Sequence, residues 1–169
     1  MLKVRLAVAT LGISMILALI PALQAQTPVA PLPSQILTAK KVFISNARGE
    51  WNPYHWSGTP ERTYNEFYAA IKNWGRFEIV SAPSDSDLVL QIGFTETIAM
   101  YGIGQVNNPQ FKLLILDPKT NIQLWILDEH VELDRKIEKN DRNFEVGINN
   151  LLGYLKALTA QPAPTSSTK

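Results

Sequence analysis

Residues 111–131, FKLLILDPKTNIQLWILDEHV, consist of two apolar segments separated by a short polar turn. Phe111–Leu116 and Ile122–Val131 are rich in the aliphatic and aromatic residues that favour strands. Asp117–Asn121 lies between them and contains Pro118, whose ring fixes φ at the value that a turn position requires. The stretch therefore predicts a β-hairpin.

Upstream of this hairpin, three more segments have strand character and one has a helical pattern. The strand segments are Lys41–Asn46, Phe77–Ser81 and Leu88–Thr97. Thr59 can cap a helix with Pro60 at its first position, where a missing N–H costs little. Gly75 provides a C-terminal stop for this helix. Its apolar residues share one helical face: Tyr64, Phe67, Tyr68, Ile71 and Trp74.

A second amphipathic helix is expected after the hairpin, beginning near Asn140 or Asp141. Its apolar residues are Phe144, Ile148, Leu151, Leu152, Leu155 and Leu158. The elements then have the order β-α-β-β-β-β-α. Because each helix has one apolar face, we expect an α/β (α+β) two-layer sandwich, with the helices packed on one face of a mixed five-stranded sheet. A helical turn over Ser34–Ala39 and long irregular loops over Ala47–Gly58 and Ile98–Pro109 complete the predicted domain.

Two local patterns carry a resemblance to known proteins. Ser86–Leu90 resembles the "A-D-[LI]-V-[LI]" strand start of small periplasmic domains, and Asp117–Trp125 resembles their "D-x-x-T-x-x-x-L-W" hairpin. On these residues the chain is similar to uncharacterised exported bacterial α/β proteins. More distantly it resembles the TolB amino-terminal domain and periplasmic accessory lipoproteins of related fold. The resemblance implies a module without catalytic residues that contacts other envelope proteins.

The amino-terminal residues have the pattern of a secretory signal peptide. Lys3 and Arg5 precede an apolar run, Leu6–Ile20, that is short for a bilayer span. We expect residues 1–25 to be the signal peptide, with cleavage before Gln26 and an uncleaved anchor as the alternative. We expect residues 26–33 to form a Pro-rich tether, 34–160 a single domain and 161–169 a disordered tail. The prediction is a periplasmic or secreted protein without an integral membrane domain after cleavage.

Composition excludes several functional classes. The chain has no cysteine, which rules out disulfides, thiolate chemistry and a lipid-modified cysteine. Without Lys3 and Arg5, 14 basic residues stand against 15 acidic ones, a net charge of −1. This near-neutrality argues against nucleic acid as a partner, because nucleic acid requires a basic surface.

Residues 50–56, EWNPYHW, hold the strongest candidate for a binding site. Trp51, Tyr54, His55 and Trp56 lie close together in a predicted loop, where aromatic rings can stack on a sugar or anchor a protein partner. We group Tyr101, from the second predicted loop, with them. The alternative is that the aromatic residues fold back as a lid over the sheet edge or a helix end.

Other constellations point only weakly to chemistry. Asp128, His130 and Glu132 share one face of a strand and could ligate a metal, but a solvated strand end is the favoured explanation, because a metal site normally draws ligands from several elements. Glu96, Asp128 and Glu129 are the candidates for a carboxylate pair. No cofactor is expected, since no dinucleotide or nucleophile motif is present.

The functional prediction is an exported accessory module that acts by contact with another envelope protein. A small carbohydrate- or ligand-binding domain that uses residues 50–56 is the alternative, and a hydrolase is the third. The sequence leaves the oligomeric state open.

Overall fold

The computed structural model describes residues 31–101 and 104–160, the side chains of residues 99–106 excepted. The predicted signal peptide, most of the tether and the C-terminal tail lie outside these residues. The elements in chain order are α1 (Ser34–Thr38), β1 (Lys41–Gly49), α2 (Arg62–Trp74), β2 (Glu78–Ile79), the 3₁₀ turn η1 (Pro83–Asp85), β3 (Leu88–Tyr101), β4 (Gly104–Leu116), β5 (Gln123–His130) and α3 (Ile137–Thr159). In the described part of the chain, no helix is both long and apolar enough to cross a bilayer.

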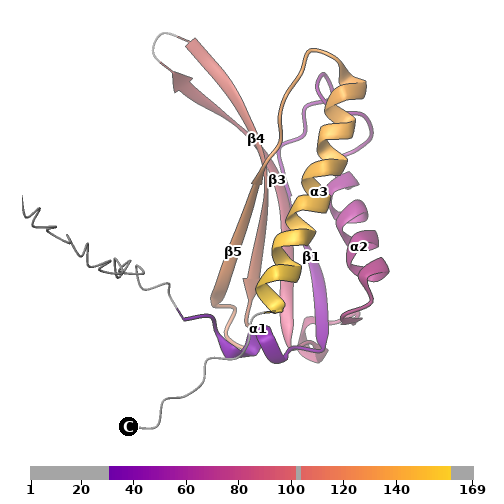
Figure 1. Ribbon diagram of the computed structural model, residues 1–169, viewed down its shortest axis with the longest axis vertical. Coiled ribbons are helices and arrows are strands. Elements are labelled where there is room, and N and C mark those ends of the chain that lie inside the picture. Colours follow the sequence, from indigo (N-terminus) through magenta and orange to yellow (C-terminus); the bar gives the residue numbers. More distant parts are fainter. Residues whose placement is uncertain (1–30, 102–103, 161–169) are drawn as a thin grey trace, which may run out of the picture. The chain divides into compact units, whose positions relative to one another are not determined.

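The five strands form one mixed sheet in the order β2-β1-β3-β4-β5 (Figure 1). β1 runs parallel to β2 and to β3, and the pairs β3–β4 and β4–β5 are antiparallel. The two-layer sandwich with a mixed five-stranded sheet is thus confirmed. The predicted turn over Asp117–Asn121 connects β4 to β5, as its proline and polar residues indicate.

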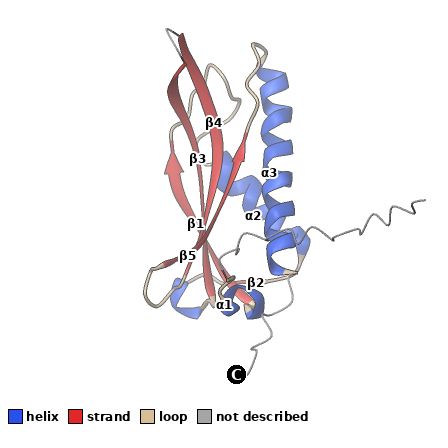
Figure 2. Cartoon of the chain, turned by 60° about the vertical axis from the view of Figure 1, so that its left-hand side comes forward, coloured by secondary structure: helices blue, strands red, loops and turns tan. Residues whose placement is uncertain are grey.

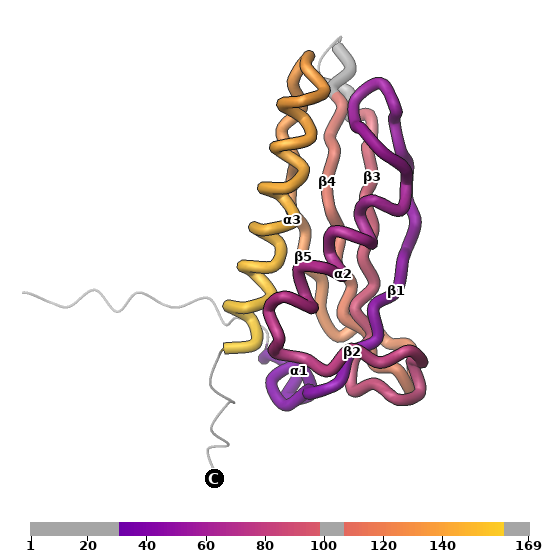
Figure 3. Tube along the Cα trace, turned by 90° about the vertical axis from the view of Figure 1, so that its right-hand side faces the viewer, coloured from indigo at the N-terminus to yellow at the C-terminus, as the bar shows by residue number. Residues whose placement is uncertain are grey.

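Both long helices cover the same face of the sheet (Figures 2 and 3). Phe67 and Ile71 of α2 and Phe144 and Leu151 of α3 are fully buried against the strands, in one core cluster. α3 approaches the sheet closely at Gly147, where an added Cβ would lie 2.7 Å from Cε2 of Phe111. A side chain at this position would therefore push the helix away from the sheet.

Two loops predicted from the sequence are shorter than expected. β1 continues through Gly49, with a register irregularity between Asn46 and Arg48. At Gly49 (φ 155°), a Cβ would lie 1.8 Å from the carbonyl oxygen of Phe94, so the close approach of β1 to β3 requires glycine. The prediction of a long irregular loop over Ile98–Pro109 is wrong, because Ile98–Tyr101 extends β3 and Gly104–Pro109 extends β4.

Candidate functional site

Trp56 of the predicted aromatic loop lies in the core rather than on the surface. Its side chain is 1% exposed. The indole ring packs edge-on against Phe94, with a centroid distance of 5.3 Å, and in a tilted arrangement against Phe144, with a centroid distance of 5.7 Å. Its indole N–H donates a hydrogen bond of 3.2 Å to Oε2 of Glu96. The prediction that Trp56 belongs to an exposed binding surface is therefore wrong. The ring packs against Phe94 of β3 and Phe144 of α3, as the lid alternative expects.

A buried carboxylate fixes the loop to β3. Glu96 is only 8% exposed, and its second oxygen, Oε1, lies 2.6 Å from Nδ1 of His55. Nδ1 of His55 also lies 3.1 Å from the amide nitrogen of Asn52. The backbone carbonyl of His55 accepts a hydrogen bond of 3.1 Å from the buried amide of Asn140 on α3. His55 is thus a structural residue that links the loop to a strand and to a helix.

A second set of polar contacts fixes the end of the same loop. The Arg62 guanidinium donates hydrogen bonds to Asp141 and to the carbonyl of Ser57, and lies 4.4 Å above the ring of Phe144. Burial alone would raise the pKa of Asp141, but hydrogen bonds from Ser57 and the charge of Arg62 outweigh it and hold that pKa below its usual value. Two sets of contacts therefore hold the C-terminal part of the loop: Glu96 holds His55 and Trp56, and the Arg62–Asp141 pair holds Ser57.

The two remaining aromatic residues of the loop differ sharply in exposure. Trp51 is half-buried and packs against Phe94 and Phe144, with centroid distances of 6.4 and 5.9 Å. Tyr54 is 84% exposed and has the largest exposure of the large apolar and aromatic side chains that the structure describes. The backbone of Tyr101 belongs to β3, but its side chain lies outside the described residues. That Trp51, Tyr54 and Tyr101 bind a partner stays a prediction.

A groove runs between this loop and the base of the β3–β4 hairpin. Its volume is about 420 Å³, and we call it the loop–hairpin groove; its lining residues are Glu50, Trp51, Asn52, Pro53, Glu96, Ile98 and Asn107. Ile98 is 62% exposed and is the cross-strand partner of Asn107. Apolar groups from two segments far apart in the sequence thus face the same depression, together with the carboxylate of Glu50.

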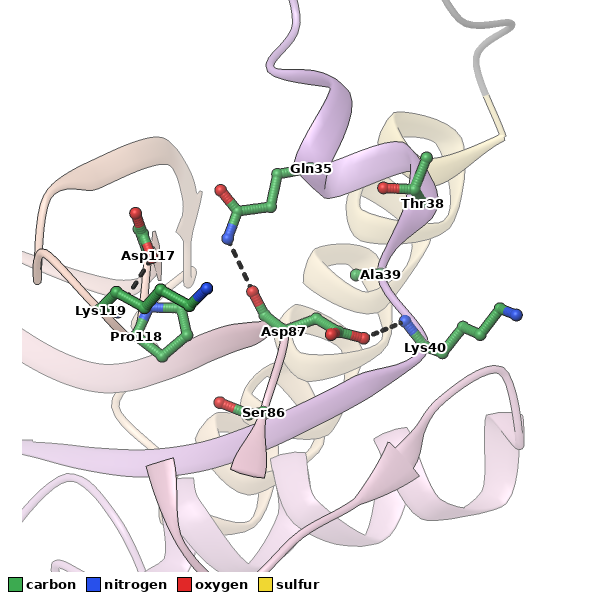
Figure 4. A pocket seen from close by; sticks show the side chains of 9 residues that line it. All are labelled: Gln35, Thr38, Ala39, Lys40, Ser86, Asp87, Asp117, Pro118 and Lys119. Atoms are coloured by element: carbon green, nitrogen blue, oxygen red, sulfur yellow. Dashed lines mark hydrogen bonds between the residues drawn. The ribbon is translucent and has the colours of Figure 1, made fainter. Parts of the chain in front are cut away.

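The two motifs that carried the resemblance have structural roles. Asp87 accepts hydrogen bonds from the backbone N–H groups of Lys40 and Lys41, at 2.8 and 2.9 Å, and these donors hold its pKa below the usual value (Figure 4). Asp117 accepts hydrogen bonds from the N–H of Lys119 and the hydroxyl of Thr120, both at 2.9 Å, which stabilise the β4–β5 turn. Both aspartates line a pocket of about 460 Å³, but their oxygens are engaged in these backbone and turn contacts.

The acidic residues considered for metal binding or hydrolysis do not converge. Asp128 and His130 are exposed, and no group of three metal-ligating side chains occurs in the described residues. Glu129 accepts a hydrogen bond of 2.8 Å from Asn150 of α3 and lines a separate groove at the β5 edge. Glu96, in contrast, lines the loop–hairpin groove. Glu96 and Glu129 therefore line different grooves.

The residues that sequence reasoning missed are polar groups in long-range contacts. Glu96 and Asn140 are both buried and hydrogen-bonded to the aromatic loop, 40 to 85 residues away in sequence. Glu96 lies in a segment with strand pattern and has the same parity as the core residues Ile92 and Phe94. That inward position of a carboxylate was the one available signal.

The chain is similar in structure to several solved proteins, but no protein family could be assigned. No family model and no curated protein matches the chain. Among solved structures, the PelC dodecamer from Paraburkholderia phytofirmans shares 11% identity at a TM-score of 0.44, over 73% of this chain and 89% of that chain. The hypothetical protein CT253 from Chlamydia trachomatis shares 9% identity at a TM-score of 0.47, over 72% of this chain and 99% of that chain.

Lipoprotein GNA1162 from Neisseria meningitidis is a third similar structure, with 11% identity and a TM-score of 0.41 over 70% of this chain and 99% of that chain. The similar structures are thus bacterial proteins, lipoproteins and hypothetical proteins among them. This agrees with the expected resemblance at a coarse level, whereas the similarity to the TolB amino-terminal domain stays a prediction. TM-scores below 0.5 assign neither a family nor a function.

Proposed function

We propose that this chain is a non-catalytic accessory module of the bacterial cell envelope that binds another protein through the loop–hairpin groove and Tyr54. The observation that carries the proposal is Tyr54, an aromatic side chain 84% exposed on a loop that is otherwise held tightly. Tyrosine and tryptophan dominate the energetics of protein interfaces, because they offer large rigid areas with a polar edge.

The rigidity of the loop supports this proposal. Trp56 in the core, the hydrogen bonds to Glu96 and the Arg62–Asp141 pair fix the loop before any partner arrives. A surface that is already ordered loses little conformational entropy on binding. The loop therefore presents Tyr54 and Trp51 in a defined geometry.

The lining of the groove indicates the chemistry of the partner. Trp51, Pro53 and Ile98 provide apolar area, and no basic side chain lines the groove within the described residues. Glu50 is an exposed carboxylate at its rim. These features favour a partner segment that places an apolar side chain in the groove and a basic or amide group against Glu50.

The signal-peptide pattern of residues 1–25 supports the envelope assignment. A sugar-binding site is less well supported, since Trp56 is buried and Trp51 half-buried, which leaves Tyr54 as the one freely exposed ring of the loop. A hydrolase is also less well supported, because the candidate carboxylates line different grooves.

Photocrosslinking in the native envelope tests the proposal. Benzoylphenylalanine replaces Tyr54 in one variant and Tyr154 in a control variant, where the native side chain is 46% exposed on α3. We expect a protein adduct of defined mass from position 54 and none of comparable yield from position 154. Equal yields at both positions, or adducts only with glycan or lipid, would contradict the proposal.

A further inference from the structure

The β3–β4 hairpin extends beyond the strands that flank it (Figures 1 and 2). β1 ends at Gly49, opposite Phe94, and β5 ends at His130, opposite Gln110. Val131, directly after β5, still donates a hydrogen bond of 2.9 Å from its N–H to the carbonyl of Pro109. Beyond Pro109, the ladder pairs from Thr97–Asn108 to Tyr101–Gly104 join β3 and β4 only to each other, in the part of the chain that the structure describes. The hairpin end is thus a two-stranded ribbon with two strand edges that no neighbouring strand covers.

This ribbon lacks the charged side chains that usually keep strand edges from pairing with other chains. Edge strands of monomeric proteins are usually protected by charged side chains, and residues 97–111 contain no Lys, Arg, Asp or Glu. Ile98 exposes 62% of its surface on the ribbon. A two-stranded ribbon is at best marginally stable in water without further packing. The ribbon therefore has the properties of a surface that gains stability from an additional strand.

The two edges of the ribbon are not equally suited to accept that strand. The β4 edge contains Pro109, which has no N–H to donate, and the residues Gly104, Asn107 and Asn108, which are unfavourable in strands. The β3 edge contains Thr95, Thr97, Ile98 and Tyr101, which belong to the residue types that strands favour. The β3 edge, Thr95–Tyr101, is therefore the better edge for pairing.

We propose that two copies of this chain pair through Thr95–Tyr101, antiparallel and around a two-fold axis at Ile98. A two-fold contact places each residue of a segment near the same segment of the other copy, so a charged segment repels itself. Residues 97–101 carry no charge, and the carboxylate of Glu96 is buried and hydrogen-bonded to Trp56 and His55. The absence of charge fits a second copy better than a partner recognised by opposite charge. This inference goes beyond the proposed function, which concerns a different protein.

Single cysteine variants test the pairing, because the chain has no cysteine of its own. Directly opposed residues of antiparallel strands have Cβ atoms about 4.5–5.5 Å apart, within reach of a disulfide after a small adjustment. Ile98→Cys has a matched control in Ile122→Cys, since the two side chains are 62% and 61% exposed. The protein is expressed from its full-length sequence, purified from the cell envelope and oxidised at low micromolar concentration.

We expect the Ile98→Cys variant to form the disulfide dimer at least tenfold faster than the Ile122→Cys variant. Equal rates would show random collision and overturn the proposal. Sedimentation equilibrium of the cysteine-free protein gives the second measurement. We expect a dimer whose dissociation constant rises at least tenfold in Ile98→Lys and stays unchanged in Ile122→Lys.

Two other outcomes of these measurements also overturn the proposal. The first is a protein that sediments as a monomer at every concentration. The second is a monomer that floats with vesicles of phosphatidylethanolamine and phosphatidylglycerol and loses this binding in Ile98→Lys, which would assign the ribbon to a lipid surface instead.

Discussion

Replacement of Trp56 by alanine tests whether the aromatic loop is part of the core. Deletion of a large buried aromatic side chain costs about 3–5 kcal/mol. Loss of the indole donor also leaves Oε2 of the buried Glu96 without that hydrogen bond, which adds about 1–3 kcal/mol. The free energy of unfolding should therefore fall by about 4–8 kcal/mol, a large part of the roughly 5–15 kcal/mol that holds an ordinary domain together.

Two matched variants separate the contributions to this loss. Trp56→Phe keeps a ring against Phe94 and Phe144 but removes the N–H donor, so we expect a loss of about 1–3 kcal/mol. Tyr54→Ala, two residues away, removes an exposed ring and should change the free energy of unfolding by at most about 0.5 kcal/mol.

Urea unfolding followed by far-UV circular dichroism measures all three variants on one scale. The reasoning is refuted if Trp56→Ala and Tyr54→Ala give the same small change. That result would mean that the loop does not close onto the core in solution.

Three further predictions concern the stability of the domain. Gly147→Ala should destabilise the protein by about 1–3 kcal/mol, because its Cβ would overlap the buried ring of Phe111. Gly153→Ala on the same helix is the control, because a Cβ there meets nothing within 4 Å; it should stabilise the protein by about 0.5–1 kcal/mol in thermal unfolding. A Gly153→Ala variant less stable than Gly147→Ala would contradict the close approach of α3 to the sheet. The lowered pKa of Asp87 means that its contribution to stability is present above about pH 4 and is lost as the pH falls further, through the folded-state pKa. Asp87→Asn should therefore flatten the decline of the urea midpoint below about pH 4, and an unchanged decline would refute this role. Trp125→Ala should lower the free energy of unfolding by about 3 kcal/mol, the low end for deletion of an aromatic side chain, because Trp125 packs against the core but is only partly buried. An unchanged melting temperature would contradict this packing.

The sequence was sufficient to predict those elements whose pattern lies within a single segment. The helical face of Phe67 and Ile71 and that of Phe144 and Leu151 are buried, as their spacing indicates. The β4–β5 turn follows from Asp117–Asn121, whose side chains stabilise it without help from distant residues. Where a single segment contains both the pattern and its physical cause, the sequence was sufficient for the prediction.

The aromatic loop shows why the site was harder to predict. Trp51 and Trp56 have no periodic pattern, so nothing in residues 50–56 distinguishes a buried ring from an exposed one. The difference arises from Glu96, which accepts the Trp56 N–H from a strand 40 residues away. Burial of Trp56 depends on this partner as well as on Phe94 and Phe144, and no local pattern reveals such a pairing.

The prediction of a loop over Ile98–Pro109 was wrong for a related reason. Gly104–Pro109 contains a glycine, two asparagines and a proline. Each of these residue types, taken alone, favours a loop over a strand. These residues are nonetheless strand residues, because β3 provides a continuous ladder of partners up to the pair Tyr101–Gly104. Strand propensity reflects the surroundings of a residue more than its identity, so a good strand can hold a poor one in register. Thr95–Tyr101, with its β-branched and aromatic residues, is the strand that does so here. If that strand orders a weak partner along one of its edges, its opposite edge can pair with the more favourable Thr95–Tyr101 segment of a second copy, and the cysteine experiment at Ile98 measures that capacity directly.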